Sequence, residues 1–283
     1  MTSATTRPGP DSAERAQRAE IGVIGGSGFY SFLSAAQEVS VSTPFGDPSD
    51  PLTVGEVAGR RVAFLPRHGR DHRFPPHRVN YRANLWALRA LGVRQVLAPC
   101  AVGSLRAELA PGTVVVPDQV VDRTWDRAST VFDTMGPVVH LPFADPYCPR
   151  GRDAVLAAQG SSPLGVVDGG TLVVINGPRF STRAESRWHA AAGWSLVGMT
   201  GMPEASLARE LGLCYTSVAL VTDLDAGVEA GEGVTHEEVM AVFGRNVEHL
   251  KTLLTAAVAG LPRDDRCPCQ HALDGVPLPI ELP

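Results

Sequence analysis

Short apolar runs alternate along the chain with segments in which apolar residues recur every three or four positions. Short apolar runs are typical of buried strands, and the wider spacing is typical of helices that bury one face. The expected strands span residues 21–24, 39–41, 52–57, 61–66, 94–98, 113–117, 170–175, 197–199 and 213–221. The expected helices span residues 80–91, 152–159, 181–192, 202–211 and 235–259. Thr235 and Glu238 form a capping-box pattern at the start of the last helix.

This alternation predicts an α/β protein, a single domain with a central mixed β-sheet flanked by helices. Residues 1–19 have no apolar core, so we expect a disordered N-terminal lead-in. The main domain is expected over residues 20–261. The Pro-rich tail, 262–283, is expected to pack on the surface or on a neighbouring subunit.

The composition narrows the class of partner. Of 283 residues, 44% are hydrophobic and 19% charged, as in ordinary globular domains. A net charge of −5 argues against nucleic acid or an anionic membrane as the main partner. No apolar run approaches the length of a membrane span, and the N-terminus does not resemble a secretory signal. The five cysteines are odd in number, which favours reduced thiols and a cytoplasmic location.

Two carboxylates follow the longest apolar run. Asp223 and Asp225 come directly after the strand expected at 213–221. Open α/β sheets bind ligands at the carboxyl ends of their strands, and burial there raises the pKa of a carboxyl group until it can donate a proton. The alternative is structural, because Asp after a strand often forms a turn or caps a helix.

Several segments carry groups that suit a small anion. Gly25–Gly28 includes Ser27 and follows a strand, so it is either an anion-binding loop or a tight turn. Arg67 and His68 follow another strand, and the Arg- and His-rich stretch continues to Arg78. Their alternative is a surface arginine beside a structural histidine. Thr200 precedes a helix, where its hydroxyl and amide suit an anion.

Cys100 and Ala101 are small enough for a ligand to lie along the backbone. No base partner for Cys100 is evident, so covalent catalysis is not expected. Phe180 lies in a loop, where it stacks on an aromatic ligand or packs in the core. Ser181 is the expected cap of the helix at 181–192.

No metal site is expected. Asp223 and Asp225 lack His or Cys at ligand spacing. Cys267 and Cys269 lie near His271, but their spacing is too tight for an ordinary zinc site. A surface tail or a local disulfide is the expectation for them.

Many of these stretches, in this order, resemble the trimeric purine nucleoside phosphorylases, in the subgroup closest to 5′-methylthioadenosine phosphorylase. The resemblance covers roughly residues 20–260. The matching stretches are 21–28, 43–46 with 48–50, 67–70, 79–81 with 83–84, 103–105, 118–119, 140–142 with Pro146, 177–185, 199–200, 203–204 and 222–225.

The resemblance implies phosphorolysis, in which phosphate displaces a purine from C1′ of a nucleoside with inversion. The phosphate-binding residues it implies are Ser27, Arg67, His68, Cys100, Ala101 and Thr200. Phosphate is then a co-substrate and no cofactor is needed. A homotrimer is implied, or a hexamer.

The same resemblance assigns the nucleoside. Met199 lies under the ribose with His72 nearby, and His140 reaches a neighbouring subunit's site. Phe180 stacks on the base, Asp223 faces N7 and Asp225 faces the 6-amino group of adenine. Both aspartates are therefore the expected catalytic residues, and adenine is the expected base.

Two departures leave the 5′ substituent open. Asn176 stands where the methylthioadenosine enzymes generally have Glu. His236 resembles the histidine that reaches the 5′-hydroxyl in enzymes acting on ordinary nucleosides; alternatively, it is a solvent-exposed residue in the first turn of a capped helix. Val234 and Val239 are expected to line the same 5′ pocket. Methylthioadenosine is the default substrate, with 5′-halo and 5′-hydroxy nucleosides as alternatives and a non-catalytic nucleoside-binding protein as a remote one.

Overall fold

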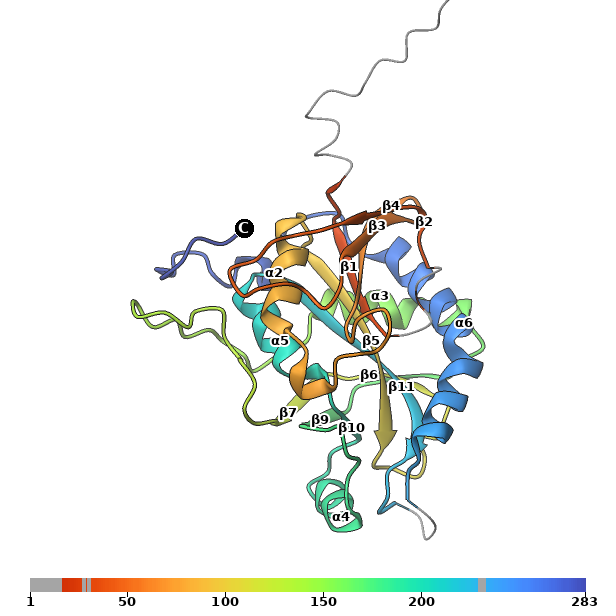
Figure 1. The fold of residues 1–283 in the computed structure, drawn as a ribbon. Helices are drawn as coiled ribbons and strands as arrows, with labels where there is room; N and C mark the ends of the chain where they lie inside the picture. The colour runs from red at the N-terminus through yellow and green to blue at the C-terminus, as the bar shows by residue number, and fades with distance from the viewer. Residues whose placement is uncertain (1–16, 27–28, 30–31, 229–232) are drawn as a thin grey trace, which may run out of the picture.

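A mixed β-sheet of eleven strands forms the centre of the molecule, as a computed structural model shows for residues 17–26, 29, 32–228 and 233–283 (Figure 1). The strands are β1 (Ile21–Gly25), β2 (Ser34–Val39), β3 (Leu52–Val57), β4 (Arg60–Pro66), β5 (Gln95–Ser104), β6 (Val114–Val116), β7 (Gln119–Arg123), β8 (Val166–Asp168), β9 (Thr171–Ile175), β10 (Leu196–Gly198) and β11 (Cys214–Leu224). The expected fold class, α/β with helices flanking a mixed sheet, is confirmed.

Four strands in the middle of the sheet run parallel. β1 pairs with β4 and β5, and β5 pairs along its whole length with β11. Their carboxyl ends therefore meet at one edge, where ligands bind in sheets of this kind. The remaining strands extend the sheet on both sides, with antiparallel pairs such as β3–β4 and β5–β10.

Helices cover both faces of this sheet (Figure 1). They are α2 (Tyr81–Ala90), α3 (Pro149–Ala157), α4 (Arg183–Ala191), α5 (Gly201–Glu210) and α6 (His236–Gly260), with short 3₁₀ turns η1 (Pro76–Arg78), η2 (Gln159–Ser161) and η3 (Pro268–His271). One apolar core cluster includes Leu85 of α2 and Leu207 of α5, and a second includes Val155 of α3 and Leu254 of α6. Neighbouring residues of one strand enter different clusters, as Val23 and Ile24 of β1 do, because successive side chains point to opposite faces.

Most expected elements are confirmed, and the errors have identifiable causes. The strand expected at 39–41 is wrong: β2 spans Ser34–Val39, and its first five residues are exposed, so they carry no apolar signal. The short strands β7 and β8 were not expected. Ser181 does not cap α4; Thr182 does, in a capping box with Glu185. The capping box of Thr235 and Glu238 is confirmed.

The C-terminal tail is described to its end, whereas the first described residue at the N-terminus is Gln17. Residues 1–16 of the expected lead-in lie outside the described residues. Ala19 is buried, and its N–H donates to the Leu91 carbonyl, so the chain already packs on the domain there. Ile280 and Leu282 in the tail pack against the core cluster of α2 and α5. Among the helices that the structure describes, none has the length and apolar character of a membrane span.

Candidate active site

A pocket of about 530 Å³ opens at the carboxyl ends of β1, β4, β5 and β11. Twelve of the predicted site residues line it: Arg67, His68, His72, Cys100, Ala101, Phe180, Met199, Thr200, Asp223, Asp225, His236 and Val239. Segments far apart in sequence therefore meet at one place. His140 and Val234 do not line it, and Ser27 lies outside the described residues, although its neighbour Gly26 lines the pocket.

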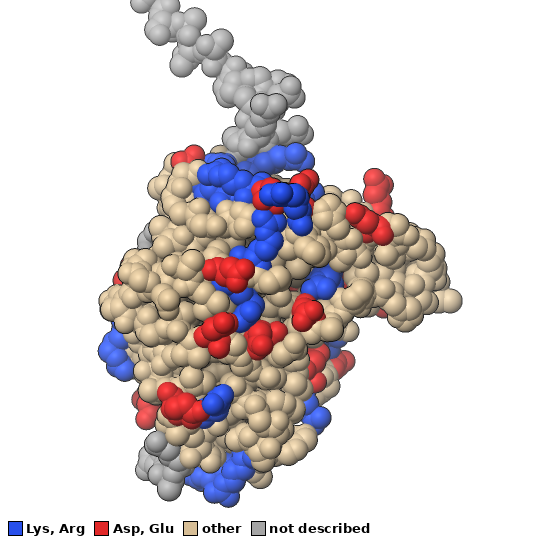
Figure 2. Space-filling model, turned by 180° about the vertical axis from the view of Figure 1, so that it is seen from behind, with Lys and Arg blue, Asp and Glu red and all other residues tan. Residues whose placement is uncertain are grey.

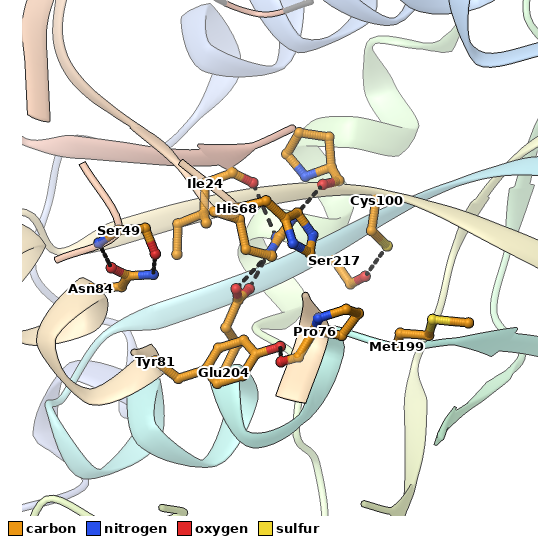
Figure 3. A network of polar contacts seen from close by, with 12 residues as sticks. Ile24, Ser49, His68, Pro76, Tyr81, Asn84, Cys100, Met199, Glu204 and Ser217 are labelled. Carbon is orange, nitrogen blue, oxygen red and sulfur yellow. Dashed lines mark hydrogen bonds and ion pairs between the residues drawn. The ribbon is translucent and has the colours of Figure 1, made fainter. Parts of the chain in front are cut away.

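Arg67 is a buried residue of the pocket lining, and protein groups orient its guanidinium. Its Nε donates to Glu204 Oε1 at 2.5 Å, and its Nη2 donates to Glu204 Oε2 at 3.0 Å. The Pro99 and Ile24 carbonyls accept two further hydrogen bonds, both at 3.1 Å. These bonds use four of the five guanidinium N–H groups, which leaves one to reach an anion. Figure 3 shows Glu204 pointing from α5 at this network, below His68.

Glu204 is one functional residue that the sequence analysis missed, since it stood there only as part of a matched stretch. It is fully buried, and Tyr215 Oη donates to its Oε2 at 2.8 Å. Its charge balances that of Arg67, so the attraction for a phosphate is weaker than an unpaired arginine would give. No local signal could reveal this pair, because the two residues are 137 positions apart.

His68 faces the pocket as a neutral imidazole. Its Nδ1–H donates to the Phe74 carbonyl at 2.8 Å, which leaves Nε2 as an acceptor. Burial, followed by the charge of Arg67, lowers the pKa of His68 to about 4. His72 stacks on it with ring centroids 4.5 Å apart, and burial with the nearby His236 lowers the pKa of His72. Neither ring adds a full positive charge at neutral pH.

The basic stretch beyond His68 is largely paired with carboxylates. The backbone N–H of Arg70 donates to Asp50 at 2.7 Å, and its guanidinium pairs with Glu38 and Asp50. Arg73 lines the pocket and pairs with Asp71 and Asp50. The prediction that this whole stretch attracts an anion is therefore too broad, because the charge of Arg70 stabilises the fold around Asp50.

Cys100 and Ala101 belong to β5, which continues six residues beyond the strand end expected at Ala98 and ends at Ser104. The Cys100 thiol lies 3.7 Å from the Ser217 hydroxyl (Figure 3). Burial raises the pKa of Cys100, which keeps it a neutral thiol. This agrees with the expectation that Cys100 is not a nucleophile.

Asp223 lies inside β11, at an irregularity of its pairing with β5. The register shifts between Val221 and Asp223, and Asp223 then faces Gly103. A Cβ atom on Gly103 would lie 2.8 Å from Asp223 Oδ1, so only glycine leaves room for the carboxylate. The Thr222 hydroxyl donates to Asp223 Oδ2 at 2.9 Å. Burial, with the charge of Asp225, raises the pKa of Asp223 to about 6.

Asp225 is only 3% exposed, and its backbone N–H donates to the Ser104 carbonyl at 2.9 Å. Its Oδ2 has no hydrogen-bond partner among the described residues. A buried carboxylate oxygen of this kind needs a donor, and a ligand amine can supply one. The cap alternative fails for both aspartates, since α6 begins at His236, eleven residues beyond Asp225, with Thr235 as its cap.

Phe180 and Met199 also line the pocket. Phe180 is half-buried and belongs to neither main core cluster, which favours ligand contact over core packing. A bidentate ion pair of Arg179 with Glu185, at 2.7 Å for both bonds, holds its loop on α4. Thr200 is the N-terminal cap residue of α5, and its side chain makes no capping hydrogen bond.

Arg127 is a second residue that the sequence analysis missed. Its guanidinium donates to the carbonyls of Asn176, Met199 and Met202, at 2.7, 2.9 and 2.6 Å. It thereby fixes the backbone on which Met199 and Thr200 stand. Arg127 Nε also donates to Asn176 Oδ1 at 3.2 Å. The asparagine that stands where the methylthioadenosine enzymes generally have Glu therefore helps to hold Arg127 in this position.

The first turns of α6 form the outer wall. His236 and Val239 line the pocket together with Met240 and Phe243, and His236 is solvent-exposed. His236 therefore fits parts of both alternatives. It is a solvent-exposed residue in the first turn of a capped helix, and it also lines the pocket, where a residue that contacts the 5′ group would lie. Val234 precedes the helix and does not line the pocket, so its place near the 5′ group stays a prediction.

The side chains that could bind a metal ion lie outside the pocket. Among the described residues, the one cluster that could hold an ion is formed by Cys148, Cys214, Cys267 and Cys269. His271 is not part of it, because its ring bonds to Asp274 and to the Asp265 carbonyl.

Comparison with known proteins identifies the family to which the chain belongs. Residues 20–259 match the family model described as the phosphorylase superfamily. A purine nucleoside phosphorylase of Streptomyces coelicolor is 65% identical over 94% of this chain and 98% of its own. An S-methyl-5′-thioadenosine phosphorylase of Mycobacterium tuberculosis is 61% identical over 93% of this chain and 97% of its own.

Solved structures similar to this chain come from the same family. A methylthioadenosine phosphorylase from an antarctic soil metagenomic library is 40% identical, with a TM-score of 0.85 over 91% of this chain and 92% of its own. A Schistosoma mansoni methylthioadenosine phosphorylase in complex with adenine is also 40% identical, with a TM-score of 0.84 over 90% of this chain and 96% of its own. The chain belongs to the phosphorylase superfamily.

Proposed function

We propose that this enzyme is a pentosyltransferase that cleaves 5′-modified adenine nucleosides with phosphate, with 5′-methylthioadenosine as the default substrate. The products are adenine and the 5-modified ribose 1-phosphate. One observation carries the proposal: Asp223 and Asp225 line the same pocket as the anion-binding groups at Arg67 and Thr200. The relatives named for methylthioadenosine and for purine nucleosides support it.

The reaction follows from this arrangement. An oxygen of phosphate bonds to C1′ as the C1′–N9 bond breaks, and the electron pair of that bond moves into the purine. Asp223, with its pKa raised to about 6, shares or gives its proton to N7 as that charge develops. Asp225 accepts a hydrogen bond from the 6-amino group, which a 6-oxo group cannot donate. Phosphate attacks from the face opposite the base, so C1′ is inverted.

In this scheme phosphate is held by one charged donor, Arg67, whose charge Glu204 balances, and by neutral donors. The remaining N–H of Arg67, the Thr200 hydroxyl and backbone amides supply hydrogen bonds, and Ser27 stays in this set as a prediction. The reaction requires no cofactor in this scheme, since phosphate is the co-substrate. We place Phe180 against the base and Met199 with His72 against the ribose.

The alternative substrate is a nucleoside with a 5′-hydroxyl, and one observation favours it. His236 brings a polar group to the part of the pocket formed by Val239, Met240 and Phe243. The relative from Streptomyces coelicolor, 65% identical, carries the name purine nucleoside phosphorylase. A 5′-halogen is intermediate in polarity between hydroxyl and methylthio, so it remains in the comparison.

A substrate panel decides between them. Phosphate-dependent adenine release is measured for methylthioadenosine, adenosine and 5′-fluoro-5′-deoxyadenosine, with the wild type and His236→Val. Removing the imidazole should raise the ratio of kcat/KM for methylthioadenosine over adenosine by about tenfold, since the site then prefers an apolar group. His249→Val, the same change on the same helix away from the pocket, is the control. An unchanged ratio would show that His236 does not affect the preference for the 5′ group. No adenine release with any substrate would contradict the proposal that the protein is a phosphorylase.

We also propose a cytoplasmic homotrimer, or a hexamer of two trimers, in which His140 reaches the pocket of a neighbouring subunit. The long segment between β7 and α3 supports this, because it projects from the sheet (Figure 1) and exposes Trp125, Met135 and Val138. Figure 2 shows few charged side chains on the projecting lobe at the right. Free cysteines in the described chain fit a reducing compartment. Sedimentation equilibrium should give three or six chains per particle, and a monomer would contradict the proposal.

A further inference from the structure

Four of the five cysteines converge on one point away from the active site. Cys148 precedes α3, Cys214 begins β11, and Cys267 and Cys269 flank Pro268 at the start of η3. Their Sγ atoms all lie within 4.8 Å of one another, and Cys148 Sγ is 3.5 Å from Cys267 Sγ. Their side chains form a core cluster that contains no other described residue.

These separations match a tetrahedral metal site. With Zn–S bonds of about 2.3 Å, the edges of an S₄ tetrahedron are about 3.8 Å long. A disulfide needs sulfur atoms about 2.05 Å apart, and all five cysteines of the structure are free. Four sulfurs in tetrahedral reach are the ligand set of structural zinc sites. We propose that Cys148, Cys214, Cys267 and Cys269 bind one structural Zn²⁺ ion.

The surroundings favour thiolate ligands. The side-chain amide of Gln270 donates to Cys214 Sγ at 3.6 Å. Hydrogen bonds to ligand sulfur atoms orient the ligands of metal sites. All four side chains are at most 6% exposed, so the site is closed, as structural zinc sites are. Binding replaces four S–H protons by one ion and releases the protons to solvent.

Hydrogen bonds and an ion pair near the four cysteines hold their backbone in place. The Cys148 N–H donates to the Tyr215 carbonyl at 2.8 Å, and the Cys214 N–H donates to the Arg94 carbonyl at 2.9 Å. Arg150 of α3 binds Asp264 through two hydrogen bonds of 2.8 Å, which brings the tail to the cluster. The tight spacing of Cys267 and Cys269 is therefore sufficient, because the fold supplies the other two ligands.

The ion would fasten the C-terminal tail to the domain. Beyond the cluster, the tail runs along the side of α2 and α5 (Figure 1), and Ile280 and Leu282 pack on the core there. Pro279 lies next to Gly136 of the segment between β7 and α3. The site thus links the sheet, α3 and the tail that supports this segment.

The test measures metal and thiols in the full-length protein. We expect about one zinc per chain, and five reactive thiols after denaturation with a chelator and without reductant. Replacement by Co²⁺ should give the thiolate-to-metal charge-transfer bands and the d–d bands of a tetrahedral site. Fewer than five thiols without metal would show disulfides. Five thiols without metal, even after zinc is supplied, would show packing only. Iron in equal amount would reject zinc. Each of these three results overturns the proposal.

Variants locate the site. Cys269→Ser should lose most of the bound zinc and lower the thermal midpoint by at least about 5 °C. Cys100→Ser is the matched control, because Cys100 is the one cysteine outside the cluster, and it should keep its zinc. A Cys269→Ser protein with full zinc would contradict the ligand assignment. If this variant fails to fold, the zinc and cobalt measurements on the wild type still decide.

Discussion

Replacing Asp223 by Asn lowers kcat/KM for adenine nucleosides by about 10²–10⁴-fold, the usual size of a lost general acid. The amide cannot give a proton to N7, although its volume and its contact with Thr222 are kept. The loss for inosine should be far smaller, since an amide at this place suits 6-oxopurines. Phosphorolysis rates for both nucleosides provide the measurement, and equal losses for the two would refute the assignment of Asp223 to N7.

The pH profile gives a second readout of the same change. The carboxyl acts in its protonated form, and its pKa is about 6. The wild-type kcat/KM should therefore fall as the pH rises above about 6, towards a tenfold loss per unit. Asp223→Asn should lose this limb and keep the titration of phosphate itself. An identical profile in both proteins would mean that another group controls the rate.

The same pKa predicts a stability effect with a defined sign. The folded-state pKa of Asp223 is raised from 3.8 to about 6, so the folded chain binds this proton more tightly than the unfolded chain does. The contribution is fully present below about pH 4 and is lost as the pH rises through 6. It amounts to at most about 3 kcal/mol. Asp223→Asn should thus gain stability relative to the wild type between pH 4 and pH 6.5 in denaturant unfolding.

Replacing Glu204 by Gln destabilises the protein by about 3 kcal/mol or more, because the Arg67 charge stays buried without its counter-ion. Arg67 and Glu204 are 3% and 0% exposed, so water cannot replace the lost partner. The thermal midpoint should fall by about 6–12 °C. Thermal unfolding measures this directly.

A double variant separates charge from packing. Arg67→Met with Glu204→Gln removes both charges, so it should recover much of the lost stability while phosphorolysis stays low. Recovery of both stability and activity would show that Arg67 does not serve phosphate. A Glu204→Gln protein as stable as the wild type would show that the ion pair contributes little to folding.

Much of the fold was accessible from local patterns. The apolar runs at 21–24, 52–57 and 170–175 are strands, and α6 begins at the predicted capping box, because burial on both sheet faces and helix capping leave signals within a few residues. β2 was misplaced because an exposed edge strand carries no apolar signal. The Ser181 cap was wrong because Thr182, one residue later, forms the capping box with Glu185.

The sequence by itself determined the class of chemistry: two aspartates behind a buried strand, and anion-binding groups at the ends of other strands. Parallel strands must bring such ends to one edge, so local order along the chain was sufficient. Only the tertiary structure decided the partner of Arg67, the room that Gly103 leaves for Asp223, and the four-cysteine cluster. Arg67 meets Glu204 across 137 positions and Cys148 meets Cys267 across 119. Contacts at such separations are set by packing of the whole chain, and no local pattern encodes them.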